Sequence, residues 1–168
     1  QDRKSLYQDE DFSRFWNERA GPQGEPYKRH VLDPVLMQLA GSLKGCSVLE
    51  MGCGNGYLGP TFVKAGVSKL VLMDISEHNI NYARKLNAGP LVNFLVHDAT
   101  LPWPLAAESF DVVYSNMMLN EVEDIITPLV QAFRVLKPQG QLLFSVTHPA
   151  WDLFVYAQHL AGKPMEKM

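Results

Sequence analysis

A carboxylate followed by closely spaced glycines is the part of this chain best suited to chemistry. The stretch Ser47–Gly59 reads SVLEMGCGNGYLG, so an apolar run leads into Glu50, and Gly52, Gly54 and Gly56 follow at alternate positions. Glycines let the backbone turn tightly and approach a ligand closely, because they have no Cβ and positive φ costs them little. The pattern predicts a nucleotide-cofactor loop at the end of a strand.

The charge of Glu50 indicates which cofactor the loop takes. A pyrophosphate on this turn would meet a charge of its own sign, and two like charges ~5 Å apart at an effective dielectric of ~20 repel by roughly 3 kcal/mol. A ligand with positive groups would gain where pyrophosphate loses. S-adenosylmethionine carries a sulfonium and an ammonium group beside its ribose and adenine, so it suits a glycine loop that opens with an acid. Cys53 lies within this loop and is expected to contact the same ligand.

The loop also matches a second pattern. Gly54-x-Gly56-x-x-Gly59, with Asp74 about 20 residues beyond its first glycine, fits the dinucleotide fingerprint. That pattern alone leaves a nicotinamide or flavin loop open, and a purely structural turn as well. Glu50, and the absence of lysine and arginine between Gly45 and Val63, favour S-adenosylmethionine.

Four further candidates follow the second and third predicted strands, at the edge where open parallel sheets bind ligands. Asp74 could accept both ribose hydroxyls, because Ser76 is expected to cap the next helix and so leave Asp74 free. Ile75 would pack on the adenine face. Asp98 could accept a hydrogen bond from the adenine amino group, while Ala99 offers its backbone N–H. Their alternative roles are a helix cap for Asp74 and a turn residue for Asp98.

The loop after the fourth predicted strand should enclose the methionine end of the cofactor. Asn116 is the candidate for a polar contact there, and Met117 and Met118 either line an apolar slot or simply fill the core. His148, after the fifth strand, could be an acid, a base or a substrate contact, although a lone histidine is commonly a surface group. The sequence assigns no catalytic base, and its histidines have no metal-ligand spacing, so we expect no metal.

The elements that position these residues alternate between strand and helix. This order predicts an α/β fold with a parallel sheet covered on both faces. A helix capped by Thr127, with Pro128 in its first turn, is expected to bury Leu129, Phe133 and Leu136. N-terminal helices are expected over 9–19 and 27–42. The second should place its apolar side on the sheet, with Pro34 at its first turn or at a kink. Strands are expected over 46–51, 69–74, 91–97, 110–115 and 141–147.

Composition limits the classes of function. The 168 residues suit one domain, which we divide into an N-terminal helical cap (1–44), a cofactor-binding core (45–149) and a tail (150–168). The net charge of −3 provides no basic field for nucleic acid, and the apolar runs are too short to span a membrane, so we expect neither partner and a cytoplasmic location. Cys46 and Cys53 lack the spacing of a zinc site or a disulfide framework and are expected to be reduced.

Together these motifs resemble the class I S-adenosylmethionine-dependent methyltransferases, particularly those that act on small molecules. The resemblance rests on Glu50–Gly56, Asp74, Asp98–Ala99, Asn116 and Arg134–Gly140, in that order. It implies a three-layer Rossmann-like sandwich with strand order 3-2-1-4-5, S-adenosylmethionine as cofactor and a small-molecule methyl acceptor. It also places Tyr27 and Arg29 in a segment that covers the cofactor in similar proteins.

Two departures from the family pattern carry expectations of their own. Gln139 stands where the family usually has glycine, which puts a left-handed turn in doubt. After Pro149 too few residues remain for the closing hairpin, so the fifth strand would be an apolar edge. Either the chain is part of a longer protein, or the 151–160 segment, a partner or a second copy covers that edge. A nicotinamide-dependent oxidoreductase and a non-catalytic cofactor-binding module remain the alternative functions.

Overall fold

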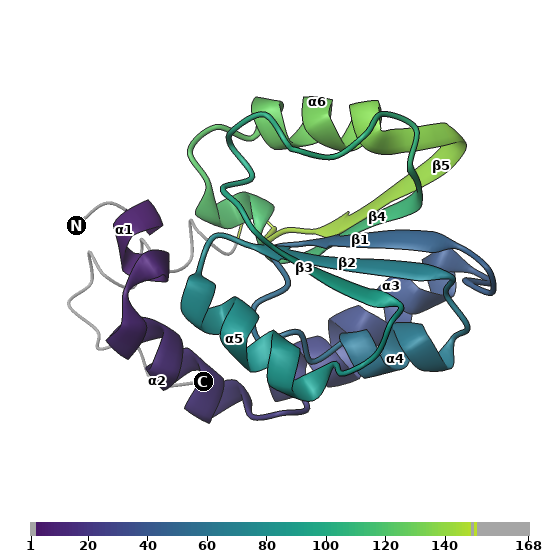
Figure 1. Cartoon of the computed structure of the whole chain (residues 1–168). Helices are drawn as coiled ribbons and strands as arrows, with labels where there is room; N and C mark the ends of the chain where they lie inside the picture. Colours follow the sequence, from purple (N-terminus) through teal and green to yellow (C-terminus); the bar gives the residue numbers. More distant parts are fainter. Residues whose placement is uncertain (1–2, 149, 151–168) are drawn as a thin grey trace.

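Five parallel strands form a single sheet in the order β3-β2-β1-β4-β5 (Figure 1). The computed structural model describes residues 3–148 and 150, so the tail and the 151–160 segment expected to cover the sheet edge lie outside the described residues. The predicted α/β architecture and strand order are confirmed. The strands are β1 (Ser47–Met51), β2 (Lys69–Asp74), β3 (Val92–Val96), β4 (Phe110–Asn116) and β5 (Leu136–Ser145).

Helices cover both faces of the sheet (Figure 1). Successive side chains of a strand point to opposite faces, so Val48 packs with the helices of one face and Leu49 with the helix of the other, and both are fully buried. The first face carries α3 (Asp33–Ala40), α4 (Gly59–Lys64) and α5 (Glu77–Leu86), and the second carries α6 (Ile126–Val135). No described helix has both the length and the apolar character needed to cross a bilayer.

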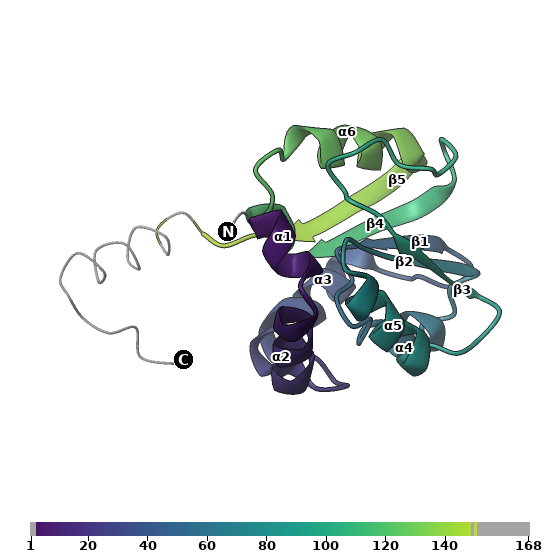
Figure 2. The same ribbon diagram turned by 60° about the vertical axis from the view of Figure 1, so that its left-hand side comes forward.

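The N-terminal helices α1 (Arg3–Gln8) and α2 (Glu10–Ala20) lie beside the carboxyl ends of the strands (Figure 2). Asp9 caps α2 by accepting a hydrogen bond from the Phe12 N–H. The buried face of α2 is polar. The Ser13 and Ser76 hydroxyls are 2.9 Å apart, and Asn17 Nδ2 donates to Asn79 Oδ1 at 3.0 Å. These pairs fix α2 against the start of α5, which places the N-terminal segment over the edge where the predicted site lies.

The segment expected to be one helix over 27–42 contains two forms of helix. A π-helical turn, η1 (Lys28–Leu32), precedes α3, and the Asp33 N–H donates to the Lys28 carbonyl. Pro34 lies in the first turn of α3, directly after the π-helical turn, so the helical run continues through it. Only part of the predicted apolar face is buried: Leu36 and Ala40 are in the core, whereas Val31, Val35 and Leu39 are exposed.

The region around α6 corrects three predictions. Asp124, and not Thr127, caps the helix, because its Oδ1 accepts from the Ile126 and Thr127 N–H groups. Phe133 is 69% exposed instead of buried, since it lies on the outer face of α6. The turn at 137–140 lies within a longer β5, where Gln139 has a φ of 66°. The left-handed turn therefore forms without glycine. Of the other two apolar residues predicted to be buried there, Leu136 is buried and Leu129 half-buried.

Candidate functional site

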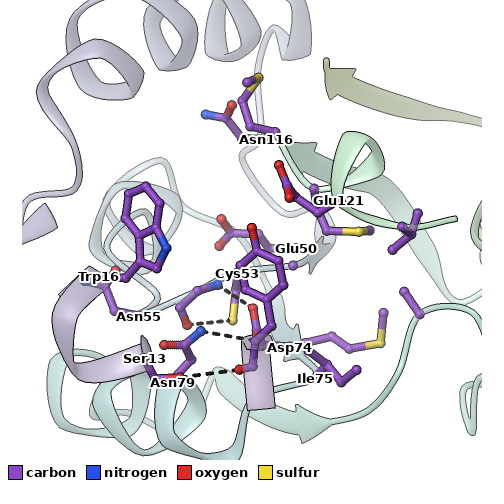
Figure 3. A pocket seen from close by; sticks show the side chains of 18 of the residues that line it. Ser13, Trp16, Glu50, Cys53, Asn55, Asp74, Ile75, Asn79, Asn116 and Glu121 are labelled. Carbon is purple, nitrogen blue, oxygen red and sulfur yellow. Dashed lines mark hydrogen bonds between the residues drawn. The ribbon is translucent and has the colours of Figure 1, made fainter. Parts of the chain in front are cut away.

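A cavity of about 740 Å³ lies at the carboxyl ends of the strands, under the N-terminal helices. Its volume falls within the ~300–1,000 Å³ typical of small-molecule pockets. The structure brings all nine predicted cofactor residues to this one cavity, and Figure 3 shows several of them facing it. They are Glu50, Gly52, Cys53, Gly54, Asp74, Ile75, Asp98, Ala99 and Asn116.

The backbone N–H groups of the glycine loop are already bonded within the protein. Gly52 and Cys53 both donate to the Met73 carbonyl, at 2.8 and 3.0 Å, and Gly54 donates to Asp74 Oδ2 at 2.8 Å. These bonds hold the loop against the end of β2. A pyrophosphate is bound through free N–H groups at such a turn, and these three are not free for one.

Gly52 and Gly54 are required for different reasons. Both have positive φ, at 72° and 54°. A Cβ on Gly52 would lie 2.4 Å from Met118 Cγ, so its lack of a side chain serves packing inside the protein. A Cβ on Gly54 would meet nothing within 4 Å, and Gly54 lines the cavity. The open space beside Gly54 is where a ligand can approach the backbone.

Asp74 is more fully engaged than the sequence suggested. Besides the bond from Gly54, it accepts from the Ser76 N–H at 2.9 Å and from Asn79 Nδ2 at 3.3 Å. Ser76 does cap α5, as predicted, but it does not leave Asp74 free, because the Asp74 carboxylate also binds the start of that helix. A carboxylate has about four acceptor positions. Burial raises its pKa, and the bonds from Ser76, Gly54 and Asn79 oppose this rise.

Glu50 is the least satisfied group in the site. Its side chain is 2% exposed and lines the cavity, yet its Oε2 has no hydrogen-bond partner among the described residues. Burial raises the pKa of Glu50 well above its usual value, and the negative charges of Asp33 and Asp74 add to that rise. An unpartnered buried carboxylate oxygen is costly. This one is placed to accept a hydrogen bond from a positively charged ligand.

Asn116 lines the cavity, but its amide is bonded within the protein, so its polar contact with a ligand stays a prediction. Its Nδ2 donates to Asp33 Oδ1 at 2.5 Å, and its Oδ1 accepts from the Ser145 hydroxyl at 2.6 Å. Asp33 is 6% exposed and also accepts from the Tyr57 hydroxyl at 2.9 Å. Asp33 could not be predicted as a site residue, because a lone aspartate beside a proline is typical of the start of a helix.

Lys28 is a second residue that the analysis missed. It lines the cavity, and its Nζ donates to the Asn116 carbonyl at 3.2 Å. Burial lowers its pKa, while the negative charges of Glu25 and Glu50 work against that effect. The neighbours suggested by the resemblance do not line the cavity: Tyr27 is 55% exposed, and Arg29 bonds to Gln23. The resemblance pointed to the two residues that flank Lys28. In the structure Lys28, the first residue of the π-helical turn, is the one that lines the cavity.

The remaining candidates have clear local roles. Asp98 Oδ1 accepts from the Thr100 N–H at 2.9 Å and from its hydroxyl at 2.7 Å, so Asp98 also shapes its own turn. The Ala99 carbonyl accepts from Trp103 Nε1 at 3.0 Å.

His148 is exposed and does not line the cavity. Within residues 3–148 and 150, no group of three His, Cys, Asp or Glu side chains is arranged to hold a metal ion.

Comparison with known proteins identifies the class. Residues 49–144, more than half of the chain, match the methyltransferase domain family. The chain is 30% identical over 154 residues to a ubiquinone biosynthesis O-methyltransferase from Bordetella pertussis, which covers 86% of this chain and 61% of that protein. It is also 37% identical over 92 residues to a mitochondrial protein of Rattus norvegicus named arginine-hydroxylase NDUFAF5, with 55% of this chain and 26% of that protein covered.

A solved structure agrees with these sequence matches. The S-adenosylmethionine-dependent methyltransferase from Mesorhizobium loti superposes with a TM-score of 0.68 at 26% identity, covering 77% of this chain and 57% of that one. The chain thus spans about three fifths of the length of the Bordetella relative and about a quarter of the rat one. It belongs to the methyltransferase domain family, within the class I S-adenosylmethionine-dependent methyltransferases, and the predicted resemblance is confirmed.

Proposed function

We propose that this chain binds S-adenosylmethionine in the cavity and transfers its methyl group to a small-molecule acceptor. The observation that carries the proposal is Glu50, a buried residue that lines the cavity and whose Oε2 has no partner among the described residues. An ammonium group of the cofactor would supply the missing donor. The residues present therefore fit a cationic nucleoside.

The other lining residues fit the rest of the cofactor. Asp74 has one acceptor position left on Oδ2 for a ribose hydroxyl, because three of its about four positions are already occupied. Ile75 and Ala99 provide apolar surface and Asp98 polar surface for the adenine. Gly54 leaves the space through which the ligand reaches the loop. We assign Asn116 a positioning role, since its amide holds Asp33 and Ser145 and no longer points freely into the cavity.

S-adenosylmethionine itself supplies the chemistry, a methyl group on a positively charged sulfur. The chain's residues must align the acceptor and keep water out of the cavity. The aromatic residues Phe12 and Trp16 of α2 line the outer part of the cavity and serve that purpose. The bonds from α2 to Ser76 and Asn79 hold this cover in place.

The nicotinamide alternative loses its main support in this structure. A dinucleotide needs the N–H groups of the glycine turn for its phosphates, and Gly52, Cys53 and Gly54 have already donated theirs to the end of β2. Glu50 adds a negative charge at the same place. A non-catalytic module differs from an enzyme only in turnover, so the experiment must measure binding and methyl transfer separately.

Calorimetry with S-adenosylhomocysteine, the demethylated product, tests the binding. We expect micromolar-range affinity in the wild type, a loss of at least tenfold in Glu50→Gln and no change in Glu18→Gln, a matched substitution on the exposed side of α2. Reduced nicotinamide dinucleotide should give no heat. Transfer of a labelled methyl group to a panel of small acceptors then separates an enzyme from a binding module. Tighter binding of the dinucleotide than of S-adenosylhomocysteine would refute the proposal.

We also propose that two copies of the chain associate through β5. Among the described residues no strand pairs with its outer edge, and Phe144 and Val146 are 44% and 48% exposed there. An apolar open edge is a template for strand pairing. Sedimentation should show a dimer that Phe144→Lys disrupts and Phe15→Leu, on exposed α2 surface, does not; a monomer at all concentrations would oppose the proposal. The cytoplasmic location stays a prediction.

A further inference from the structure

We propose that the methyl acceptor is a small molecule whose positively charged group binds between an aromatic wall and an acidic rim of the cavity. A separate, neutral nucleophilic atom of that molecule forms the new bond to the methyl group as the bond to the cofactor's sulfur breaks, and it releases its proton to water. This inference rests on the proposed function and adds the chemical class of its acceptor. The aromatic wall consists of Tyr7, Phe12 and Trp16, from α1 and α2, and the acidic rim consists of Glu25, Glu121, Glu123 and Asp124, all of which line the cavity.

The aromatic wall is a connected group of rings. Tyr7 and Phe12 meet edge to face with centroids 5.3 Å apart, and Phe12 and Trp16 do the same at 6.2 Å. Trp16 remains 38% exposed, so part of its ring surface is available to a ligand. Rings attract a cation to their faces, and tryptophan does so most strongly. A wall of this kind suits an ammonium group with carbon substituents.

The residues of the acidic rim come from the segment before α6 and from the loop before η1. Figure 3 shows Trp16 and Glu121 on opposite sides of Glu50. Glu121 lies in the short helix η2 (Leu119–Glu121), and Glu123 and Asp124 follow it directly. A positive group near Glu50 and Trp16 would therefore have carboxylates on one side and aromatic carbon on the other.

Glu50 shows the same preference for positive charge at the cofactor's end of the cavity, where the proposed function pairs it with the cofactor's ammonium group. It is 2% exposed and comes from β1, so it belongs to neither the rim nor the wall. Glu50 lines the cavity, and its Oε2 has no partner among the described residues. The interior of the cavity is thus built for a positive group, and the rim extends the same preference outward.

The charges of the lining show that the cofactor alone does not balance them. Seven carboxyl groups are among the described side chains that line the cavity: the four of the acidic rim, Glu50, Asp74 and Asp98. Lys28 is the one lysine or arginine among these described lining residues. The formal sum is 1 − 7 = −6. S-adenosylmethionine contributes a sulfonium, an ammonium and a carboxylate, a net +1. Even if Glu50 and Asp74, whose pKa values are raised, were both protonated, the cavity would remain negative with the cofactor bound.

This excess has a consequence for the acceptor. An anionic acceptor would be repelled by the rim, and a neutral one would lack the charge–charge attraction to it. A cationic acceptor gains from the rim and the aromatic wall together. Carboxylates around the cavity also offset the repulsion between a cationic acceptor and the positive sulfur of the cofactor.

Competition between charged and neutral molecules of the same shape tests the inference. The full chain, saturated with S-adenosylhomocysteine, is titrated with choline and its neutral carbon analogue 3,3-dimethyl-1-butanol, and with benzylamine and benzyl alcohol. We expect at least one cation to bind ten times more tightly than its neutral partner, and this preference to shrink as salt is raised. The inference is overturned when neither cation binds better than its neutral partner.

Variants assign the preference to the two surfaces. Trp16→Leu and the double substitution Glu121→Gln with Glu123→Gln should each reduce the cation preference at least fivefold. The matched controls Phe133→Leu and Glu77→Gln change exposed residues that do not line the cavity, and should leave it unchanged. Binding of S-adenosylhomocysteine is measured first in every variant. Its absence in the wild type would refute the proposed function itself, whereas its presence without cation preference refutes only this inference.

Discussion

Asp33 and Asn116 are 83 positions apart in the chain, yet Asn116 Nδ2 donates to Asp33 Oδ1 across 2.5 Å. Asp33 begins α3, and Asn116 ends β4 at the lip of the cavity. The same carboxylate accepts from the hydroxyls of Tyr57 and Tyr114, at 2.9 and 3.4 Å. A single buried acid therefore joins the helix before the sheet, the loop after β1 and the end of β4.

Removal of Asp33 should loosen the site as well as the fold. Asp33→Ala leaves the amide of Asn116 and the hydroxyl of Tyr57 without their acceptor, at about 1–3 kcal/mol for a buried group left unpaired. We expect urea unfolding to show a loss of stability of about 2–3 kcal/mol. Calorimetry should show that the molecules that remain folded bind S-adenosylhomocysteine more weakly than the wild type does. Asp11→Asn, at a side chain 81% exposed, is the control, and equal stability of the two variants would contradict the role of Asp33.

The two glycines of the loop should respond differently to the same substitution. Gly52→Ala places a methyl group 2.4 Å from Met118 Cγ in a left-handed conformation, so the fold should lose about 2–4 kcal/mol. Gly54→Ala meets no protein atom within 4 Å and should cost only the ~1–2 kcal/mol of left-handed strain.

Binding of S-adenosylhomocysteine separates these two effects. Gly54→Ala should lose most of its affinity while it remains folded at 25 °C, because the added methyl group occupies the ligand's space. Thermal unfolding and calorimetry on the same samples measure both quantities. Normal affinity in Gly54→Ala would show that no ligand approaches this part of the loop.

The fold could be predicted largely from sequence, because strands buried on both faces are read directly from their apolar runs. The ends of β1, β2 and β4 then bring Glu50, Asp74 and Asn116 to one edge. Hydrogen-bond partners could not be predicted in this way. Asp74 and Asn116 turned out to bond mostly to the protein, since which groups compete for a carboxylate or an amide depends on long-range packing.

The helices show the same limit. Periodicity identified an apolar face for residues 27–42, but neither the π-helical turn nor the inward position of Lys28 follows from it. Phe133 fits the spacing of a buried residue and is nevertheless exposed, because α6 lies on the sheet with its other side. A sequence pattern predicts that a helix has an apolar face, and the neighbouring elements determine which part of that face is buried.

The pH dependence of stability should report the buried charge of Glu50. Its pKa in the folded protein is raised above the ordinary 4.5, so the unfolded chain loses the proton more easily than the folded one. The stability associated with the neutral form is complete below pH ~4.5 and is lost as the pH rises towards the folded pKa. Glu50→Gln cannot ionise, so its stability relative to wild type should increase as the pH rises above 4.5.

Comparison of the two proteins removes most of the contribution that Asp33 and Asp74 make, because both residues, whose pKa values are also raised, are present in wild type and variant. Urea unfolding at several pH values measures the difference. In the presence of S-adenosylhomocysteine the order should reverse, since the ligand's ammonium group stabilises only the charged wild type. A constant difference at all pH values would show that Glu50 does not titrate differently in the folded state.

Asp111 provides the opposite case, at the other end of the sheet from the cavity. Its Oδ2 accepts from the Ser47 N–H and hydroxyl, at 2.7 and 2.6 Å, and from Lys137 Nζ at 2.8 Å, so it ties β1, β4 and β5 together. The bond from Lys137, followed by those from Ser47, lowers its pKa to about 2. The stability it contributes is present above the unfolded value of 3.8 and is lost as the pH falls towards 2.

Asp111→Asn should therefore destabilise the protein by about 1 kcal/mol at pH 7, a modest value because the side chain is a third exposed. The difference from wild type should shrink between pH 4 and pH 2, opposite in direction to the Glu50 profile. S-adenosylhomocysteine affinity should not change, because Asp111 does not line the cavity. An affinity loss in this variant comparable with that of Asp33→Ala would mean that the cavity depends on general sheet stability, and not on the bonds that Asp33 makes at its lip.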